Sequence, residues 1–452
     1  MRLVGNPPET EHASYTSDPT IWPCMSSPAP VAAGKRPLLA VFLVVLIDLL
    51  GFGIVIPLLP VYSKAYGASE TVMGLLFATF SAMQFVFAPM WGRLSDKIGR
   101  RPVLVGGLFG TALSYVLFAL AGSLPMLFVS RALAGFFAAN ISTAMAYVAD
   151  VTTPENRAKG MGLIGAAFGI GFTLGPLMGG ELSAISPAAP GWAAAGFSLV
   201  AAMYAWSQLV EPPRAQRGSR VFSLDQVRTS IADSRIGTLY IMSFLFIVAF
   251  ASFEAMFTAY GLQRFPEVFG LQVAIEKATY DQIIAAAPTT GRYLAFIGIV
   301  SAVIQGGFIR RLVPKYGETK LAIVGPLFLA AGFVVVALAS EWWMVIVGCL
   351  LMPIGFGLNN PSLTSLISRA TPADQQGAYL GLSQSVGSLA RMTGPMIAGL
   401  AFTWYGAAAP FWWGAALLMV SGLLAMRYHA RYGTTFPKKA AGDAAGKAAG
   451  LH

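Results

Sequence analysis

Long runs of largely uncharged residues, separated by short charged segments, recur along this chain from residue 38 to residue 428. The clearest example surrounds the charged stretch 92–102, which has five charges in nine residues and lies between the apolar runs 72–90 and 103–121. A run of about 18 or more apolar residues is long enough to cross a bilayer as a helix. The chain is also 56% hydrophobic, with a mean hydropathy of +0.65. These features predict a polytopic membrane protein.

The apolar runs predict an all-α integral membrane fold with twelve transmembrane helices. We expect these at residues 38–62, 71–91, 102–121, 125–148, 160–182, 191–210, 236–261, 292–312, 319–339, 342–367, 376–400 and 408–428. The predicted organisation is a disordered tail (1–36), a six-helix half (37–210), a linker (211–235), a second six-helix half (236–428) and a second tail (429–452). The polar loop 263–291 is the longest on its side, and its pattern indicates no role.

The net charge of +10 follows membrane topology rather than nucleic-acid binding. On the side of the 92–102 loop lie 24 of the 30 Lys and Arg residues; four lie opposite and two, Arg131 and Arg391, lie within spans. This asymmetry predicts that the loop and both termini are cytoplasmic. Two cysteines give no disulfide or metal framework. Because no phosphate-binding loop or nucleophile–base pair is present, we expect neither an enzyme nor an ATP-driven pump.

The two predicted halves repeat each other. Three motifs recur at offsets of 220, 218 and 219 residues: 134–140 as 354–360, Thr153-Pro154 as Thr371-Pro372, and Gly175-Pro176 as Gly394-Pro395. The charged stretch recurs more weakly as 310–317, with Pro314 in place of Asp96. Parallel six-span repeats are typical of transporters with a substrate site between the halves. The repeat therefore predicts a two-fold symmetric, alternating-access carrier.

The charged stretch resembles the signature loop of the major facilitator superfamily, between its second and third helices. The matching positions are Gly92, Asp96, Gly99, Arg100 and Arg101, and Asp150 ends the fourth span where that family places an acid against the loop. The resemblance implies the major facilitator fold, with two pseudo-symmetric halves. It also implies a gating network of Asp96, Arg100 and Asp150 that stabilises the outward-facing state. From the residues alone, a basic loop that only fixes topology is an equal alternative.

Three more motifs resemble the twelve-span drug:proton antiporters of that superfamily, the tetracycline exporters in particular. The first runs from Asp48 to Pro57, the second is Arg131-Ala-Leu-Ala-Gly135, and the third is an antiporter motif of Gly171, Gly175, Pro176 and Gly179. In one departure, Ser114-Tyr115 stands where tetracycline exporters carry an acid before a tyrosine. The resemblance implies multidrug-type antiport by a monomer in a bacterial inner membrane, in contact with lipid and driven by a proton gradient without a cofactor.

Polar residues inside the spans are candidates for the mechanism. Asp48 lies roughly 15 Å into its span, where an unpartnered carboxylate costs at least about 2.5 kcal/mol. It is interpreted as a proton-coupling residue, with Glu254 and Arg131 as further candidates; the alternative for Asp48 is a structural carboxylate bonded to a neighbouring helix. Other polar side chains either line a substrate cavity or join helices: Gln84, Asn140, Gln305, Asn359, Asn360 and Arg391.

Three functions are compatible with these patterns. The first is proton-coupled efflux of small, mostly apolar or drug-like compounds, favoured by Asp48 and the motif around Gly175-Pro176. The second is a secondary uptake carrier for a metabolite or sugar. The third is a non-transporting membrane sensor or scaffold, whose partner would bind the outer loop or the tails.

Overall fold

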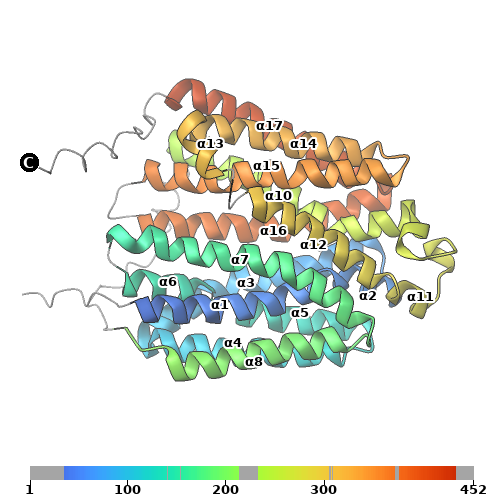
Figure 1. The fold of residues 1–452 in the computed structure, drawn as a ribbon, viewed down its shortest axis with the longest axis horizontal. Helices are drawn as coiled ribbons and strands as arrows, with labels where there is room; N and C mark the ends of the chain where they lie inside the picture. Colours follow the sequence, from blue (N-terminus) through green and yellow to red (C-terminus); the bar gives the residue numbers. More distant parts are fainter. Residues whose placement is uncertain are drawn as a thin grey trace, which may run out of the picture.

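The computed structural model describes residues 35–139, 141–152, 154–212, 233–304, 307, 309–371 and 376–433, and these form only helices and connections. The long helices run roughly parallel or antiparallel to one another (Figure 1). Helix α1 begins and helix α17 ends at the same end of the bundle, on the left in Figure 1, which we call the terminal end. The opposite end is called the distal end. The predicted all-helical fold is confirmed.

Within the described residues, the first half of the chain contains eight helices, which pack mainly with one another. They are α1 (Lys35–Val55), α2 (Leu58–Ala65), α3 (Glu70–Ile98), α4 (Arg100–Ala119), α5 (Leu124–Ala138), α6 (Ile141–Val151), α7 (Pro154–Ser183) and α8 (Ala189–Gln208). The break between α1 and α2 falls at Pro57, whose ring lacks the N–H that a continuous helix would need there.

The second half repeats this arrangement from α10 onward. Its helices are α10 (Ser234–Arg264), α11 (Tyr280–Ile284), α12 (Ala287–Val303), α13 (Ile309–Tyr316), α14 (Glu318–Ala337), α15 (Trp342–Ala370), α16 (Gln376–Tyr405) and α17 (Ala409–Tyr432). Two short 3-10 helices, η1 (Pro266–Phe269) and η2 (Ile275–Lys277), precede α11. Gly99 and Gly317 have φ values of +111° and +80° at corresponding turns, so the weakened repeat of the charged stretch adopts the same backbone turn.

Ten stretches within the described ranges are long and apolar enough to cross a bilayer. Helices α8 and α16 lie outside that set, but they occupy the sixth and eleventh predicted spans, so the twelve-span prediction is consistent with the structure. Exposed aromatic side chains gather where helices begin or end at the distal end: Trp192, Trp343, Trp404, Tyr405, Trp412 and Trp413. Such a belt is typical of the boundary between bilayer and water.

The two halves contact each other through small residues on two pairs of helices, α7 with α12 and α3 with α16. A Cβ atom at Gly180 would lie 3.0 Å from the Cα of Gly291, and one at Gly399 would lie 3.1 Å from the Cα of Thr71. The backbones therefore touch directly. All four positions lie in the distal parts of their helices, so the halves are joined at the distal end.

The polar loop 263–291 also joins the halves at the distal end. Its side chains Phe269, Ile275 and Ile283 are buried in one cluster with Leu58 and Tyr62 of α2. The segment η1–η2–α11, which belongs to the second half, thus covers α2 of the first half, as the right side of Figure 1 shows. The loop that the sequence left without a role forms a cap over the distal end.

Candidate functional site

Asp48 of α1 is half-buried near the middle of the first half. Its carboxylate accepts a hydrogen bond of 3.2 Å from the hydroxyl of Ser198 on α8, and Ser198 is fully buried. The ring of Tyr115 on α4 packs beside the same turn of α1, because a Cβ atom at Gly51 would lie only 3.3 Å from it. Three helices thus converge on the predicted proton-coupling carboxylate.

Arg131 of α5 belongs to the same cluster. Its side chain is 1% exposed, and its guanidinium carbon lies 5.9, 5.9 and 5.6 Å from the ring centres of Phe80, Tyr115 and Phe118. The Nε and Nη2 atoms have no hydrogen-bond partner among the described residues, so the aromatic faces supply the main attraction. Tyr115 is within electrostatic range of both Asp48 and Arg131. The structure therefore brings these two predicted residues to a common neighbour.

Glu254 and Arg391 form a second cluster in the other half. They lie on α10 and α16, and both are half-buried and within electrostatic range of each other. The Nη2 atom of Arg391 also donates a 3.3 Å hydrogen bond to the hydroxyl of Ser388. An opposite charge nearby lowers the penalty for each of these groups inside a membrane.

The remaining polar candidates occupy different environments. Gln84 donates a long hydrogen bond of 3.4 Å to the carbonyl of Ala138, so it joins α3 to the end of α5. Asn359 has no exposed surface and faces Gly325 of α14 between two packed helices, and its amide N and O atoms have no hydrogen-bond partner among the described residues. Its role in a substrate cavity stays a prediction. Its neighbour Asn360 is exposed. Asn140 and Gln305 lie outside the described residues.

The antiporter motif places small residues along the line where α7 crosses α1. Cβ atoms at Gly171 and Gly175 would lie 2.9 Å from Leu49 and 2.5 Å from the backbone of Gly53. Gly179 meets the carbonyl of Ile54 in the same way, one turn further along. Pro176, on the other face of α7, presents its carbonyl to Gly291 of α12. The motif therefore packs α7 against α1 within its half and against α12 across the halves.

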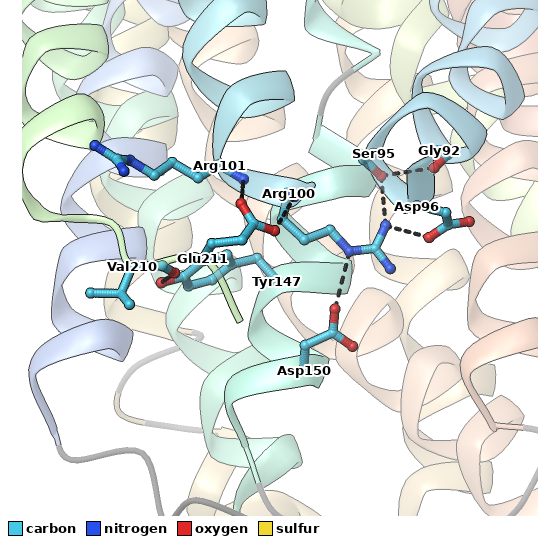
Figure 2. Close-up of polar contacts among 9 residues, drawn as sticks. All are labelled: Gly92, Ser95, Asp96, Arg100, Arg101, Tyr147, Asp150, Val210 and Glu211. Carbon is cyan, nitrogen blue, oxygen red and sulfur yellow. Dashed lines mark hydrogen bonds and ion pairs between the residues drawn. The ribbon is translucent and has the colours of Figure 1, made fainter. Parts of the chain in front are cut away.

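The signature loop carries an ion-pair network at the terminal end, drawn in Figure 2. Atom Nη1 of Arg100 lies 2.7 Å from the carboxylate of Asp96, and Nε lies 3.0 Å from the carboxylate of Asp150. Nη1 also donates a 2.5 Å hydrogen bond to the hydroxyl of Ser95, which donates to the carbonyl of Gly92. The structure thus brings together the three charged residues that the resemblance implied. Their preference for the outward-facing state stays a prediction.

Gly92 of the signature loop has open space beside it in this structure. An added Cβ atom at Gly92 would meet nothing within 4 Å, so close helix packing does not require glycine there in this conformation. Gly99 is different, because its φ of +111° is strained for any other residue. A Cβ atom there would also lie 2.7 Å from the carboxyl carbon of Glu211.

Glu211 is the residue of this region that sequence reasoning missed. Its two carboxylate oxygens accept hydrogen bonds of 2.6 and 2.9 Å from the backbone amides of Arg100 and Arg101, as Figure 2 shows. These amides open α4, where unpaired N–H groups and the helix dipole favour an anion. The available signal was a single acid directly after the sixth span, at the start of the expected linker.

The second half has a counterpart of this network with the charges exchanged. Glu318 opens α14 as Arg100 opens α4, and Arg369 lies 219 residues after Asp150. The Nη1 atom of Arg369 lies 2.9 Å from both carboxylate oxygens of Glu318, which also accepts from Ser365. The repeat therefore conserves an ion pair between corresponding helices while reversing its polarity. Among the described residues, no group of three or more His, Cys, Asp and Glu side chains could hold a metal ion.

The model of the Major Facilitator Superfamily matches residues 41–392 of this chain, and a second match covers residues 308–449. The class C tetracycline resistance protein of Escherichia coli is 32% identical over 390 residues, which are 83% of this chain and 93% of that protein. Major facilitator superfamily domain-containing protein 10 of Mus musculus is 28% identical over 433 residues, 87% of this chain and 93% of that protein.

Solved structures agree with these matches. The crystal structure of the human organic anion transporter MFSD10 has a TM-score of 0.64 and 27% identity, covering 86% of this chain and 99% of that one. A mutant form of the nucleoside transporter NupG has a TM-score of 0.70 at 12% identity, with 86% of this chain and 99% of that chain covered. At that identity the second likeness concerns the fold alone.

Proposed function

This chain belongs to the Major Facilitator Superfamily, and we propose that it exports small, mostly apolar or drug-like compounds in exchange for protons. It is an integral membrane transporter, and we place it in a bacterial cytoplasmic membrane with both termini inside. Transport occurs by alternating access: the halves, joined at the distal end in this structure, separate there while they close at the terminal end.

The observation that carries the proposal is the cluster of Asp48, Tyr115 and Arg131 inside the first half. A half-buried carboxylate with one hydroxyl donor can either remain charged or take up a proton as its exposure changes. Tyr115 lies within electrostatic range of both Asp48 and the buried guanidinium of Arg131, whose Nε and Nη2 atoms have no hydrogen-bond partners among the described residues. Proton release on one side and uptake on the other would then drive the exchange.

The names of two relatives suggest compounds for testing this proposal: tetracycline-type drugs and organic anions. The first relatives confer resistance to tetracycline by name, whereas the solved MFSD10 structure is that of an organic anion transporter. The cationic side chain of Arg391 favours an anionic compound, whereas the carboxylates of Glu254 and Asp48 favour a cationic one. Both classes therefore belong in a test panel.

The first prediction concerns Asp48. In proteoliposomes, the wild type should release protons when a transported compound is added, and Asp48→Asn should lose compound-driven proton movement completely because its side chain cannot titrate. Ser198→Ala is the matched control, since it removes the 3.2 Å hydrogen bond but keeps the carboxylate; it should still transport, with a shifted pH dependence. Normal pH-dependent exchange by Asp48→Asn would exclude proton coupling through this residue.

A further inference from the structure

An open cavity of about 410 Å³ lies between α12 and α15 near the distal end. Its two walls are matching stripes at spacings i, i+3, i+4 and i+7: Thr289, Arg292, Tyr293 and Phe296 on α12, and Trp342, Val345, Ile346 and Cys349 on α15. Such spacing places the four residues of each stripe on one helix face. The volume lies within the range of small-molecule sites.

The chemistry of this groove is apolar and aromatic with a cation at one edge. Val345 and Cys349 are buried, whereas Phe296 and Arg292 are exposed. The indole N–H of Trp342 donates a 2.8 Å hydrogen bond to the hydroxyl of Tyr293, and that hydroxyl keeps its own proton to donate. A groove of this composition suits a compound with a flat apolar body and an acidic group.

Arg292 has a partner in this structure, and that partner belongs to the other half. The guanidinium binds Glu181 of α7 in a two-point contact, with N–O distances of 2.6 and 3.2 Å. One residue before Glu181, the backbone of Gly180 meets Gly291 of α12. Separation of the halves at this level must therefore break the Arg292–Glu181 pair and leave a cation at the edge of the groove.

We propose that the α12–α15 groove is a binding site for amphipathic organic anions, whose acidic group replaces Glu181 on Arg292 when the halves separate at the distal end. The separation step depends on the proposed alternating access; the site itself does not. Because such a ligand binds the separated state and competes with Glu181 in the joined state, its binding shifts the population toward the distally open form.

The test uses purified full-length Cys24→Ser protein in a neutral detergent and two matched probes. The anionic probe is 8-anilinonaphthalene-1-sulfonate, and the neutral probe is N-phenyl-1-naphthylamine, which has the same apolar body without the acid. Binding is measured by probe fluorescence. The rate of Cys349 alkylation by N-ethylmaleimide, followed by mass spectrometry, reports occupancy of the groove floor.

The anionic probe should slow alkylation of Cys349, and Arg292→Gln should weaken its binding about tenfold, as expected for a charge-assisted hydrogen bond. The neutral probe should not respond to that change. Arg292→Lys should restore part of the affinity, and Glu181→Gln should increase it because the competing carboxylate is gone. Ile346→Trp, which fills the groove, should weaken both probes.

Three results would overturn the proposal. The first is equal affinity of Arg292→Gln and the parent protein for the anionic probe, and the second is alkylation of Cys349 that this probe does not slow. The third is probe binding that Ile346→Trp leaves unchanged. Affinity that responds instead to Glu254→Gln or Arg391→Gln would place the anion in the second-half cluster and would also overturn it. Since these measurements need no proton gradient, they stand or fail separately from the proton-coupled function.

Discussion

The carboxylate of Glu211 satisfies the first two amides of α4, and it does so from the residue where the linker between the halves begins. The same turn contains Arg100, whose side chain binds Asp96 and Asp150 on two other helices. One turn of the chain therefore joins the ends of α3, α4 and α6 to the exit of α8. The start of the linker is therefore in direct contact with the signature loop.

A second prediction follows for Glu211→Gln. Glutamine keeps one acceptor oxygen but places an NH₂ donor against the second amide, and it removes the charge that the helix dipole favours. We expect a loss of about 1 kcal/mol, seen as a lower midpoint of thermal unfolding in detergent. Glu341→Gln is the control, because Glu341 precedes α15 without a side-chain cap bond. Equal midpoints for both variants and the wild type would contradict the assigned role.

At the scale of single residues, the sequence predicted which residues belong to the candidate sites better than it predicted what surrounds their side chains. Depth within the spans singled out Asp48 and Arg131, because charges inside a membrane are rare, and the family resemblance implied the Asp96–Arg100–Asp150 network. It could not place Asn359, since hydropathy does not reveal which face of α15 meets α14. It missed Glu211 because a backbone-capping carboxylate depends on how two distant helix ends meet.

Helix α7 packs both within its own half and against the other half. One face contacts α1 within the first half, and another contacts α12 of the second half. Small residues allow both contacts to reach the backbone, as at Gly175 against Gly53 and at Gly180 against Gly291. The antiporter motif is thus a packing surface in this structure.

The third prediction compares two glycines of α7. Gly175→Ala should lower thermal stability by about 1–3 kcal/mol, because its methyl group would meet the backbone of Gly53 at 2.5 Å. A methyl group added by Gly169→Ala would meet nothing within 4 Å, so this variant should be as stable as the wild type or slightly more stable. Thermal midpoints and transport rates of the two variants test this; equal behaviour would mean that α1 and α7 need no close contact.

The fourth prediction concerns the reversed ion pair between α14 and α15. Glu318→Arg and Arg369→Glu each place like charges together, and each should reduce both stability and transport. The double variant restores opposite charges and should recover at least half of the loss, with an interaction energy of roughly 1 kcal/mol for this partly exposed pair. Additive losses in the double variant would show that the pair itself contributes nothing.

At the scale of the whole molecule, the inter-half contacts lie at the distal end: the two lines of small residues, the Glu181–Arg292 pair and the cap over α2. The hydroxyls of Thr71 and Thr403 are also 2.9 Å apart between α3 and α16. Transport by alternating access requires all of these contacts to separate in each cycle.

The fifth prediction concerns the contact between Thr71 and Thr403. Thr71→Cys with Thr403→Cys, in a Cys24→Ser, Cys349→Ala background, should form a disulfide on oxidation, because the two side chains already touch. Transport should stop on oxidation and return with a reductant, whereas either single cysteine should leave it unaffected. Undiminished transport by the fully cross-linked protein would rule out separation at the distal end.

The architecture was the part most accessible from sequence. Offsets of 218–220 residues between motifs predicted the repeated halves. The structure shows the same backbone turn at Gly99 and Gly317 and adds the pair Asp150 and Arg369 to the repeat. The cap could not be predicted, because its buried side chains are scattered through a polar loop and follow no period. The state of the bundle was equally inaccessible, since the same contacts must form and break in one sequence.

The glycine-lined contacts divide the chain into parts that can vary and parts that cannot. Where helix backbones touch, every substitution adds atoms that have no space, so inherited change at these positions is almost always harmful. Side chains that face a cavity or the α12–α15 groove have no such restriction. A few mutations at such positions could therefore change which compounds the protein binds, while the contacts on which the movement of the helices depends stay the same.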